Sequence, residues 1–152
     1  MSAPTSPPPA QVTVSVSVLG SPDKAWHAFT DPGSIVEWNF ASPDWCCPSA
    51  KNELREGGAF CYRMEARDGS FGFDFEGVFL ELSFPTRIRY ALGPDREVTV
   101  QFLQQGSTTL VSQSFIPEST HTLEQQKAGW QSILESYKKH VETAAAPRPS
   151  VH

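Results

Sequence analysis

The chain has 152 residues and a formal net charge of −5, which is enough sequence for one domain with its own hydrophobic core. It contains no run of lysine or arginine, so the electrostatic footprint of a protein that binds nucleic acid or acidic membranes is missing. No stretch approaches the roughly 18 apolar residues of a membrane span. With no export signal after Met1 and with three cysteines, two of them adjacent (Cys46 and Cys47), we expect free thiols and a cytoplasmic location.

Both ends of the chain are expected to lie outside the folded domain. Residues 1–10 are rich in proline and offer little apolar surface to bury, so we expect a disordered leader. Residues 144–152 are similar in composition and are expected to form a disordered tail. The folded domain is therefore expected to span residues 11–143.

The first third of the chain predicts one strand and two short helices. Residues 11–18 alternate between valine and polar residues, the period of a half-buried strand. Ser21-Pro22 and Asp31-Pro32 each combine an N-cap residue with a proline at the first helical position, so each predicts a short helix. Residues 39–51 contain two prolines and no periodicity, and we expect a loop there.

From residue 52 onward the pattern predicts strand after strand, joined by short antiparallel turns. The expected strands span residues 52–55, 59–66, 71–82, 87–92, 97–103 and 108–115. With the first strand they make about seven. In the last predicted hairpin, Val111 is expected to face Val100.

The segment around Asp68-Gly69 is a strong hairpin signal, because Asp-Gly between two alternating runs favours a two-residue type I′ turn. That turn places apolar residues opposite apolar ones on one face and opposite charges on the other. The predicted pairs are Met64 with Phe73, Tyr62 with Phe75 and Phe60 with Gly77 on the inward face, and Arg63 with Asp74 on the outward face.

A long amphipathic helix is predicted from about residue 122 to residue 142. At 100° per residue its inward residues fall within an arc of about 100°. These residues are Leu123, Gln126, Trp130, Ile133, Leu134, Tyr137 and Val141. Gly129 would cost about 1 kcal/mol inside a helix, which we interpret as a close approach of another backbone. A curved antiparallel sheet with this helix in its concavity buries both faces, so the fold class is α+β.

Several local motifs carry a family resemblance. They are Ser21 to Pro32 (a cap, a short helix ending in an aromatic residue, then Thr-Asp-Pro), Glu37-Trp38, Leu54 to Phe60 (L-R-x-G-G-x-F), Phe75-Glu76-Gly77 and Gly129-Trp130. In this order, over residues 12–141, they resemble the Hsp90 ATPase activator homologue 1-like family of the START-like (SRPBCC) superfamily. The resemblance implies a helix-grip (START-like, Bet v 1-like) fold, with a curved antiparallel sheet of about seven strands around a long C-terminal helix and two short helices after the first strand.

The resemblance also implies a function, because START-like proteins commonly hold an apolar ligand between the helix and the sheet. We therefore expect a small apolar or amphipathic molecule to bind in a cavity there. The candidate ligand-binding residues are Trp38, Trp45, Tyr62, Met64, Phe73, Phe75, Tyr90 and Trp130. The alternative, that these side chains only fill the core, stays open.

Two other function classes also stay open. One is an enzyme of the cyclase, dehydratase or hydrolase type that works in the cavity, for which Tyr62 is the best inward hydroxyl. The other is an interaction module that regulates a chaperone ATPase, which only the family name suggests; a homodimer stays open as well. The four histidines show no metal-ligand spacing, so the sequence assigns no metal, cofactor or catalytic residue.

Overall fold

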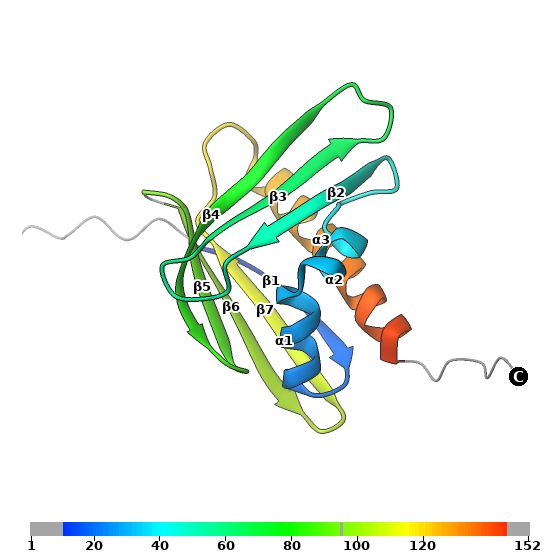
Figure 1. Cartoon of the computed structure of the whole chain (residues 1–152), viewed down its shortest axis with the longest axis vertical. Coiled ribbons are helices and arrows are strands. Elements are labelled where there is room, and N and C mark those ends of the chain that lie inside the picture. The colour runs from blue at the N-terminus through cyan, green and yellow to red at the C-terminus, as the bar shows by residue number, and fades with distance from the viewer. Residues whose placement is uncertain (1–10, 95, 146–152) are drawn as a thin grey trace, which may run out of the picture.

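A seven-stranded antiparallel sheet, in the order β1-β7-β6-β5-β4-β3-β2, forms the frame of the protein (Figure 1). The computed structural model describes residues 11–94 and 96–145. The elements are β1 (Val12–Leu19), α1 (Pro22–Thr30), α2 (Pro32–Trp38), β2 (Trp45–Asn52), β3 (Ala59–Ala66), β4 (Gly72–Ser83), β5 (Arg87–Gly93), β6 (Arg96–Gln105), β7 (Thr108–Phe115) and α3 (Leu123–Ala145). The sheet is curved, and α3 crosses its open side. The predicted α+β helix-grip fold is confirmed.

The N-terminal third forms as its local signals predict. Alternate residues of β1 are buried, which is the period of a strand with one covered face. The Ser21 hydroxyl accepts a hydrogen bond from the Lys24 backbone N–H at 3.4 Å, and the Asp31 carboxylate accepts one from the Ser34 N–H at 3.2 Å. Each cap satisfies a backbone donor that the first helical turn leaves free, so α1 and α2 begin at the predicted prolines.

The β3–β4 hairpin has the predicted register, but its turn differs from the prediction. Tyr62 pairs with Phe75 and Arg63 with Asp74, and the Arg63 Nη1–Asp74 Oδ1 distance is 3.4 Å. The strands leave residues 67–71 between them, not two residues, and no non-glycine residue among those described has a positive φ, so a type I′ turn at Asp68-Gly69 is wrong. The longer loop leaves the predicted strand register unchanged.

The chain between α2 and β3 contradicts two sequence predictions. Residues 39–51 are not all loop, because β2 occupies Trp45–Asn52 at the edge of the sheet and pairs with β3. Its pairing is irregular between Cys46 and Ser49, the kind of edge-strand position that tolerates a proline such as Pro48. The predicted strand at 52–55 is also wrong: beyond Asn52 the chain turns through Gly57, whose φ is +85°.

The β6–β7 hairpin is displaced from its prediction by two residues. Val111 pairs with Phe102, and Val100 pairs with Gln113, so the expected pairing of Val111 with Val100 is wrong. A shift of two residues keeps every side chain on its predicted face, because the side-chain period of a strand is two. The inward faces of both strands are therefore as predicted.

Helix α3 packs against β1 and the two short helices, and its buried side chains belong to the hydrophobic core. Leu134, Tyr137 and Val141 are fully buried, and the Tyr137 hydroxyl donates a hydrogen bond to the backbone oxygen of Ala25. Leu123 is 56% exposed in the first turn, so its predicted place in the inward stripe is wrong.

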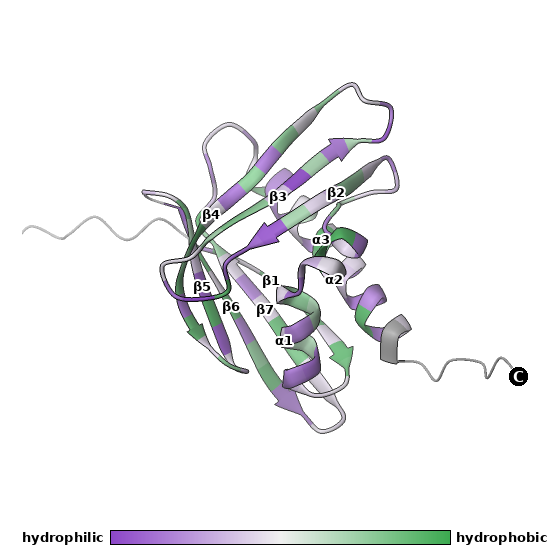
Figure 2. Cartoon of the chain, in the orientation of Figure 1, coloured by the Kyte–Doolittle hydropathy of each residue, from purple (hydrophilic) through white to green (hydrophobic). Residues whose placement is uncertain are grey.

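The hydropathy of the strands fits their position in the sheet, because hydrophobic and hydrophilic residues alternate along β3 and β4 (Figure 2).

The end of α3 differs from the predicted domain boundary. Helix α3 continues to Ala145, two residues beyond the predicted boundary at 143. The predicted leader (1–10) and the rest of the predicted tail (146–152) lie outside the described residues. Across the described part of the chain, no helix combines the length and apolar character needed to cross a membrane.

Candidate functional site

A cavity of about 490 Å³ lies between α3 and the inward face of the sheet, where the sequence predicts one. Its volume falls in the range of roughly 300–1,000 Å³ that is typical of small-molecule sites. It is lined by Phe29, Thr30, Trp38, Asn39, Ala41, Phe60, Tyr62, Met64, Phe73, Phe75, Phe79, Ile88, Tyr90, Arg96, Gln113, Glu118, His121, Gln125, Gln126, Gly129, Trp130 and Ile133.

The structure brings together all the sequence-predicted site residues except Trp45. Trp38, Tyr62, Met64, Phe73, Phe75, Tyr90 and Trp130 line the cavity. Trp45 instead lies on β2, where its ring meets the rings of Phe71 and Phe73, each at a centroid distance of 6.0 Å. Phe73 itself is 41% exposed, so it belongs to the cavity rim rather than to its interior.

Aromatic rings form a preorganised apolar wall. The ring of Phe60 lies 5.0 Å from Tyr62, 5.2 Å from Phe79 and 5.2 Å from Tyr90. Across the cavity, Trp130 stacks on Phe115 with a centroid distance of 4.2 Å and an interplanar angle of 10°. Rings that are fixed by one another offer apolar surface at little conformational cost, which suits an apolar ligand.

The Tyr62 hydroxyl is a neutral hydrogen-bond donor. Its oxygen accepts a hydrogen bond from Asn52 Nδ2 at 3.2 Å, and the same amide also donates to the backbone oxygen of Thr30 at 2.8 Å. Burial raises the pKa of Tyr62 to about 12, although the Asn52 hydrogen bond lowers it. The hydroxyl therefore keeps its proton at neutral pH and can donate a hydrogen bond to a bound molecule. It is a poor general base.

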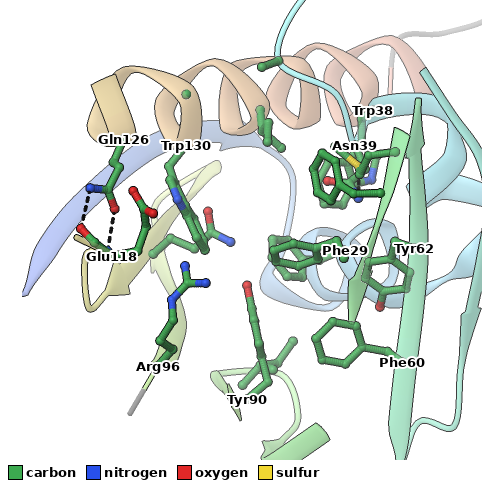
Figure 3. Close-up of a pocket in the computed structure, with 18 of the residues that line it drawn as sticks. Phe29, Trp38, Asn39, Phe60, Tyr62, Tyr90, Arg96, Glu118, Gln126 and Trp130 are labelled. Carbon is green, nitrogen blue, oxygen red and sulfur yellow. Dashed lines mark hydrogen bonds between the residues drawn. The ribbon is translucent and has the colours of Figure 1, made fainter. Parts of the chain in front are cut away.

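The opposite end of the cavity is polar. Arg96 on β6 directs its guanidinium toward Trp130 and α3, and the Tyr90 hydroxyl on β5 points in the same direction (Figure 3). Gln113 on β7 also lines this end and is 7% exposed. Burial raises the pKa of Tyr90, while the Gln113 side chain and the charge of Arg96 act against that rise. Among the described residues, Arg96 Nε is buried and has no hydrogen-bond partner.

The segment that enters α3 is held by Glu118 and Gln126. The Gln126 amide accepts a hydrogen bond from the Glu118 N–H at 2.8 Å and donates to the backbone oxygens of Glu118 and His121 at 3.0 and 2.9 Å (Figure 3). The Glu118 carboxylate accepts from the His121 N–H at 2.7 Å and lies 2.9 Å from His121 Nδ1. Partial burial raises the pKa of Glu118, but these bonds and those from Thr120 outweigh it and lower the pKa to about 2.

Gly129 lies on the cavity side of α3, and its environment overturns the expected close backbone approach. A Cβ atom built at Gly129 would meet no atom within 4 Å. The residue lines the cavity, so the missing side chain leaves ligand-accessible space instead of admitting a neighbouring backbone. Gly77 on β4 has a different environment, because a Cβ atom built there would lie 2.8 Å from the Phe60 ring.

The buried cysteine is poorly reactive. Cys47 is buried, and this burial raises the pKa of its thiol, which keeps it protonated and weakly nucleophilic. Within residues 11–94 and 96–145, no three His, Cys, Asp or Glu side chains gather in a way that could hold a metal ion.

The polar end was missed by sequence reasoning although a signal existed. Arg96 shares the parity of the inward-facing Val98 and Val100, and Gln113 that of Val111 and Phe115. A polar residue at an inward position of a strand indicates either a buried hydrogen bond or a polar site. Strand parity would therefore have identified both side chains.

Comparison with known proteins agrees with this architecture. The model of the family "Activator of Hsp90 ATPase homolog 1-like protein" matches residues 20–142. An AHSA1-like protein from Aeromonas hydrophila is 39% identical, with 93% of this chain and 99% of that chain covered and a TM-score of 0.81. A protein from Cytophaga hutchinsonii is also 39% identical, with the same coverage and a TM-score of 0.76.

More distant structures show the fold alone. A protein from Nitrosomonas europaea, 17% identical, has a TM-score of 0.77 over 89% of this chain and 96% of that chain. A search of curated proteins finds no match. Because the family model covers nearly all of the described domain, this chain belongs to the Activator of Hsp90 ATPase homolog 1-like family.

Proposed function

We propose that the protein binds a small apolar or amphipathic molecule in the cavity between α3 and the sheet. The observation that carries the proposal is the cavity itself, a space of about 490 Å³ whose walls are largely apolar and rich in aromatic rings, with Arg96 and Glu118 at one end. Such a space lowers the stability of the empty protein, because atoms that line it lose contacts on one side. A ligand that fills it restores those contacts.

Gly129 supports binding over plain core packing. A core glycine is usually retained because a side chain would collide with a neighbour, as at Gly77. At Gly129 there is no such collision, yet glycine in a helix interior costs about 1 kcal/mol relative to alanine. The position is explained if the space beside it is used by a ligand.

Three titratable residues of the cavity suit binding better than proton transfer. Its phenolic hydroxyls, Tyr62 and Tyr90, have raised pKa values and stay protonated at neutral pH. Glu118, with a pKa of about 2, stays ionised and engaged with its own segment. None of the three has the pKa near neutrality that an efficient general acid or base needs. They can orient a ligand by hydrogen bonding.

The proposal is tested by titrating the protein with decanol, a neutral amphiphile, and following the backbone NMR resonances. We expect the largest shifts at cavity residues such as Tyr62, Phe75 and Ile133. Gly129→Leu places a side chain in the cavity and should weaken decanol binding by about tenfold or more, the equivalent of losing roughly 1.4 kcal/mol. Lys127→Leu, at an exposed position of the same helix, is the matched control and should bind as the native protein does.

Two outcomes would refute the proposal. The first is a native protein that shows no saturable decanol binding. The second is binding that Gly129→Leu and Lys127→Leu weaken equally, because the ligand would then lie outside the cavity.

A further inference from the structure

Arg96 is the permanently charged basic residue of the cavity wall, and none of the ion pairs among the described residues includes it. Its Nε is buried and has no hydrogen-bond partner among the described residues. The adjacent acid on the same strand, Glu97, is engaged by Arg89 with an Oε1–Nη2 distance of 2.6 Å. Glu118, the acid that lines the cavity, is held by the His121 and Thr120 backbone and by the His121 ring. The described acids closest to Arg96 in sequence and in the cavity are thus committed elsewhere.

A guanidinium whose Nε is buried without a hydrogen-bond partner is costly for a folded protein. Arginine does not deprotonate in proteins, so it cannot escape the cost by losing its charge. Buried charges are ordinarily paired or fully hydrogen-bonded. An apolar residue of similar length would fill the same place on β6 at lower cost, which makes Arg96 difficult to explain as a structural residue.

The surroundings of Arg96 suit an acidic group. The guanidinium is a planar fork of donors that matches the two oxygens of a carboxylate. The Tyr90 hydroxyl and the Gln113 side chain lie at the same end of the cavity and supply neutral hydrogen-bonding groups. Glu118 adds a negative charge to this end, and it repels a doubly charged group such as a phosphate more strongly than a carboxylate with one negative charge.

We propose that the cavity recognises an amphipathic molecule that carries a carboxylate, with the carboxylate on Arg96 and the apolar body among Phe60, Tyr62 and Phe75. This inference rests on the proposed function and adds the chemical class of the ligand. The carboxylate forms charge-assisted hydrogen bonds with Arg96, and the rings bury the apolar body. Ligand binding then supplies a partner that the described residues do not supply.

The test compares three probes with the same chain, decanoate, decanol and decylamine, by isothermal titration calorimetry at neutral pH. Hydrogen bonds to charged groups are worth enough to change affinity by about ten- to a hundredfold. The native protein should therefore prefer decanoate to decanol by about that factor and bind decylamine most weakly. Arg96→Gln should lose this preference while keeping its affinity for decanol. Arg55→Gln, which removes an exposed charge paired with Glu53, should behave as native.

A second measurement does not depend on the folding of any variant. In the native protein, the Nε–H resonance of Arg96 should shift on addition of decanoate and stay in place on addition of decanol. If Arg96→Gln does not fold, Arg96→Lys replaces it; that variant keeps the charge, loses the planar fork and should retain only part of the preference.

The two proposals fail differently. If decanoate and decanol bind with equal affinity and the Arg96 Nε–H resonance responds to neither, the carboxylate inference is wrong and the binding function stands. If neither probe binds the native protein, the binding function is wrong and the inference falls with it.

Discussion

Replacing Gly129 with alanine should make the protein more stable. The residue lies in the interior of α3, where glycine costs about 0.8–1 kcal/mol relative to alanine. The new methyl group would meet no atom within 4 Å, so no overpacking opposes this gain. The methyl would also cover part of the cavity wall, which adds at most a fraction of the ~0.8 kcal/mol for a fully buried carbon.

The expected gain of about 1 kcal/mol is measurable by two methods. For a protein of this size it corresponds to a rise in melting temperature of about 2–4 °C. Differential scanning calorimetry measures this rise, and urea denaturation should show a higher midpoint at an unchanged slope. Ala128→Gly, at the exposed neighbouring position, is the matched control and should lower the stability by about the same amount.

One result would refute this reasoning. If Gly129→Ala lowered the melting temperature while Ala128→Gly behaved as expected, a neighbouring group would have to lie against Gly129. The cavity would then be closed beside α3, and the explanation of this glycine by ligand space would be wrong.

Two further changes test the pH dependence and the packing of the fold. Hydrogen bonds lower the pKa of Glu118 to about 2 in the folded state, so its ionised form contributes stability above the ordinary pKa of 4.5, and this contribution is lost as the pH falls toward 2. In urea titrations, the stability difference between the native protein and Glu118→Gln should therefore shrink across this range; a difference independent of pH would contradict the assignment. At Gly77 a Cβ would lie 2.2 Å from the Ala91 backbone oxygen, so thermal melts of Gly77→Ala should show a loss of about 1–3 kcal/mol, and an unchanged melting temperature would argue against this packing.

Elements with local signals were predictable, and elements defined by distant contacts were not. The caps at Ser21 and Asp31 and the alternation of β3 and β4 determine structure within a few residues, and all of these form as predicted. Strand β2 carries no alternation and contains Pro48. It is a strand because β3 supplies its hydrogen-bond partners, which the sequence of residues 45–52 does not reveal.

The residues of the candidate site were also only partly predictable from the sequence. Its rings could be predicted, because large apolar residues on inward strand positions must gather under the helix. Its polar end is hidden from an argument on residue type, because arginine and glutamine usually indicate the solvent face, and only their parity along β6 and β7 places them inward. Trp45 is predicted to bind the ligand from a loop at residues 39–51; because it belongs to β2, its ring packs on Phe71 and Phe73 instead.

The cavity also separates α3 from the β3–β4 hairpin, so α3 has fewer packing contacts with this hairpin than with β1. Helix α3 is anchored on β1 and the two short helices, while β3 and β4 face it across the cavity and extend past it (Figure 1). Few packed side chains then couple the β3–β4 hairpin to α3, so its amide hydrogens should exchange with solvent through local opening at lower free energy than those of β1 and β7. A molecule in the cavity would contact both α3 and the β3–β4 hairpin and would add packing contacts between them. Occupancy would therefore slow amide exchange in β3 and β4 far more than in β1 and β7, and the free protein and the occupied protein would differ in cooperativity rather than in shape.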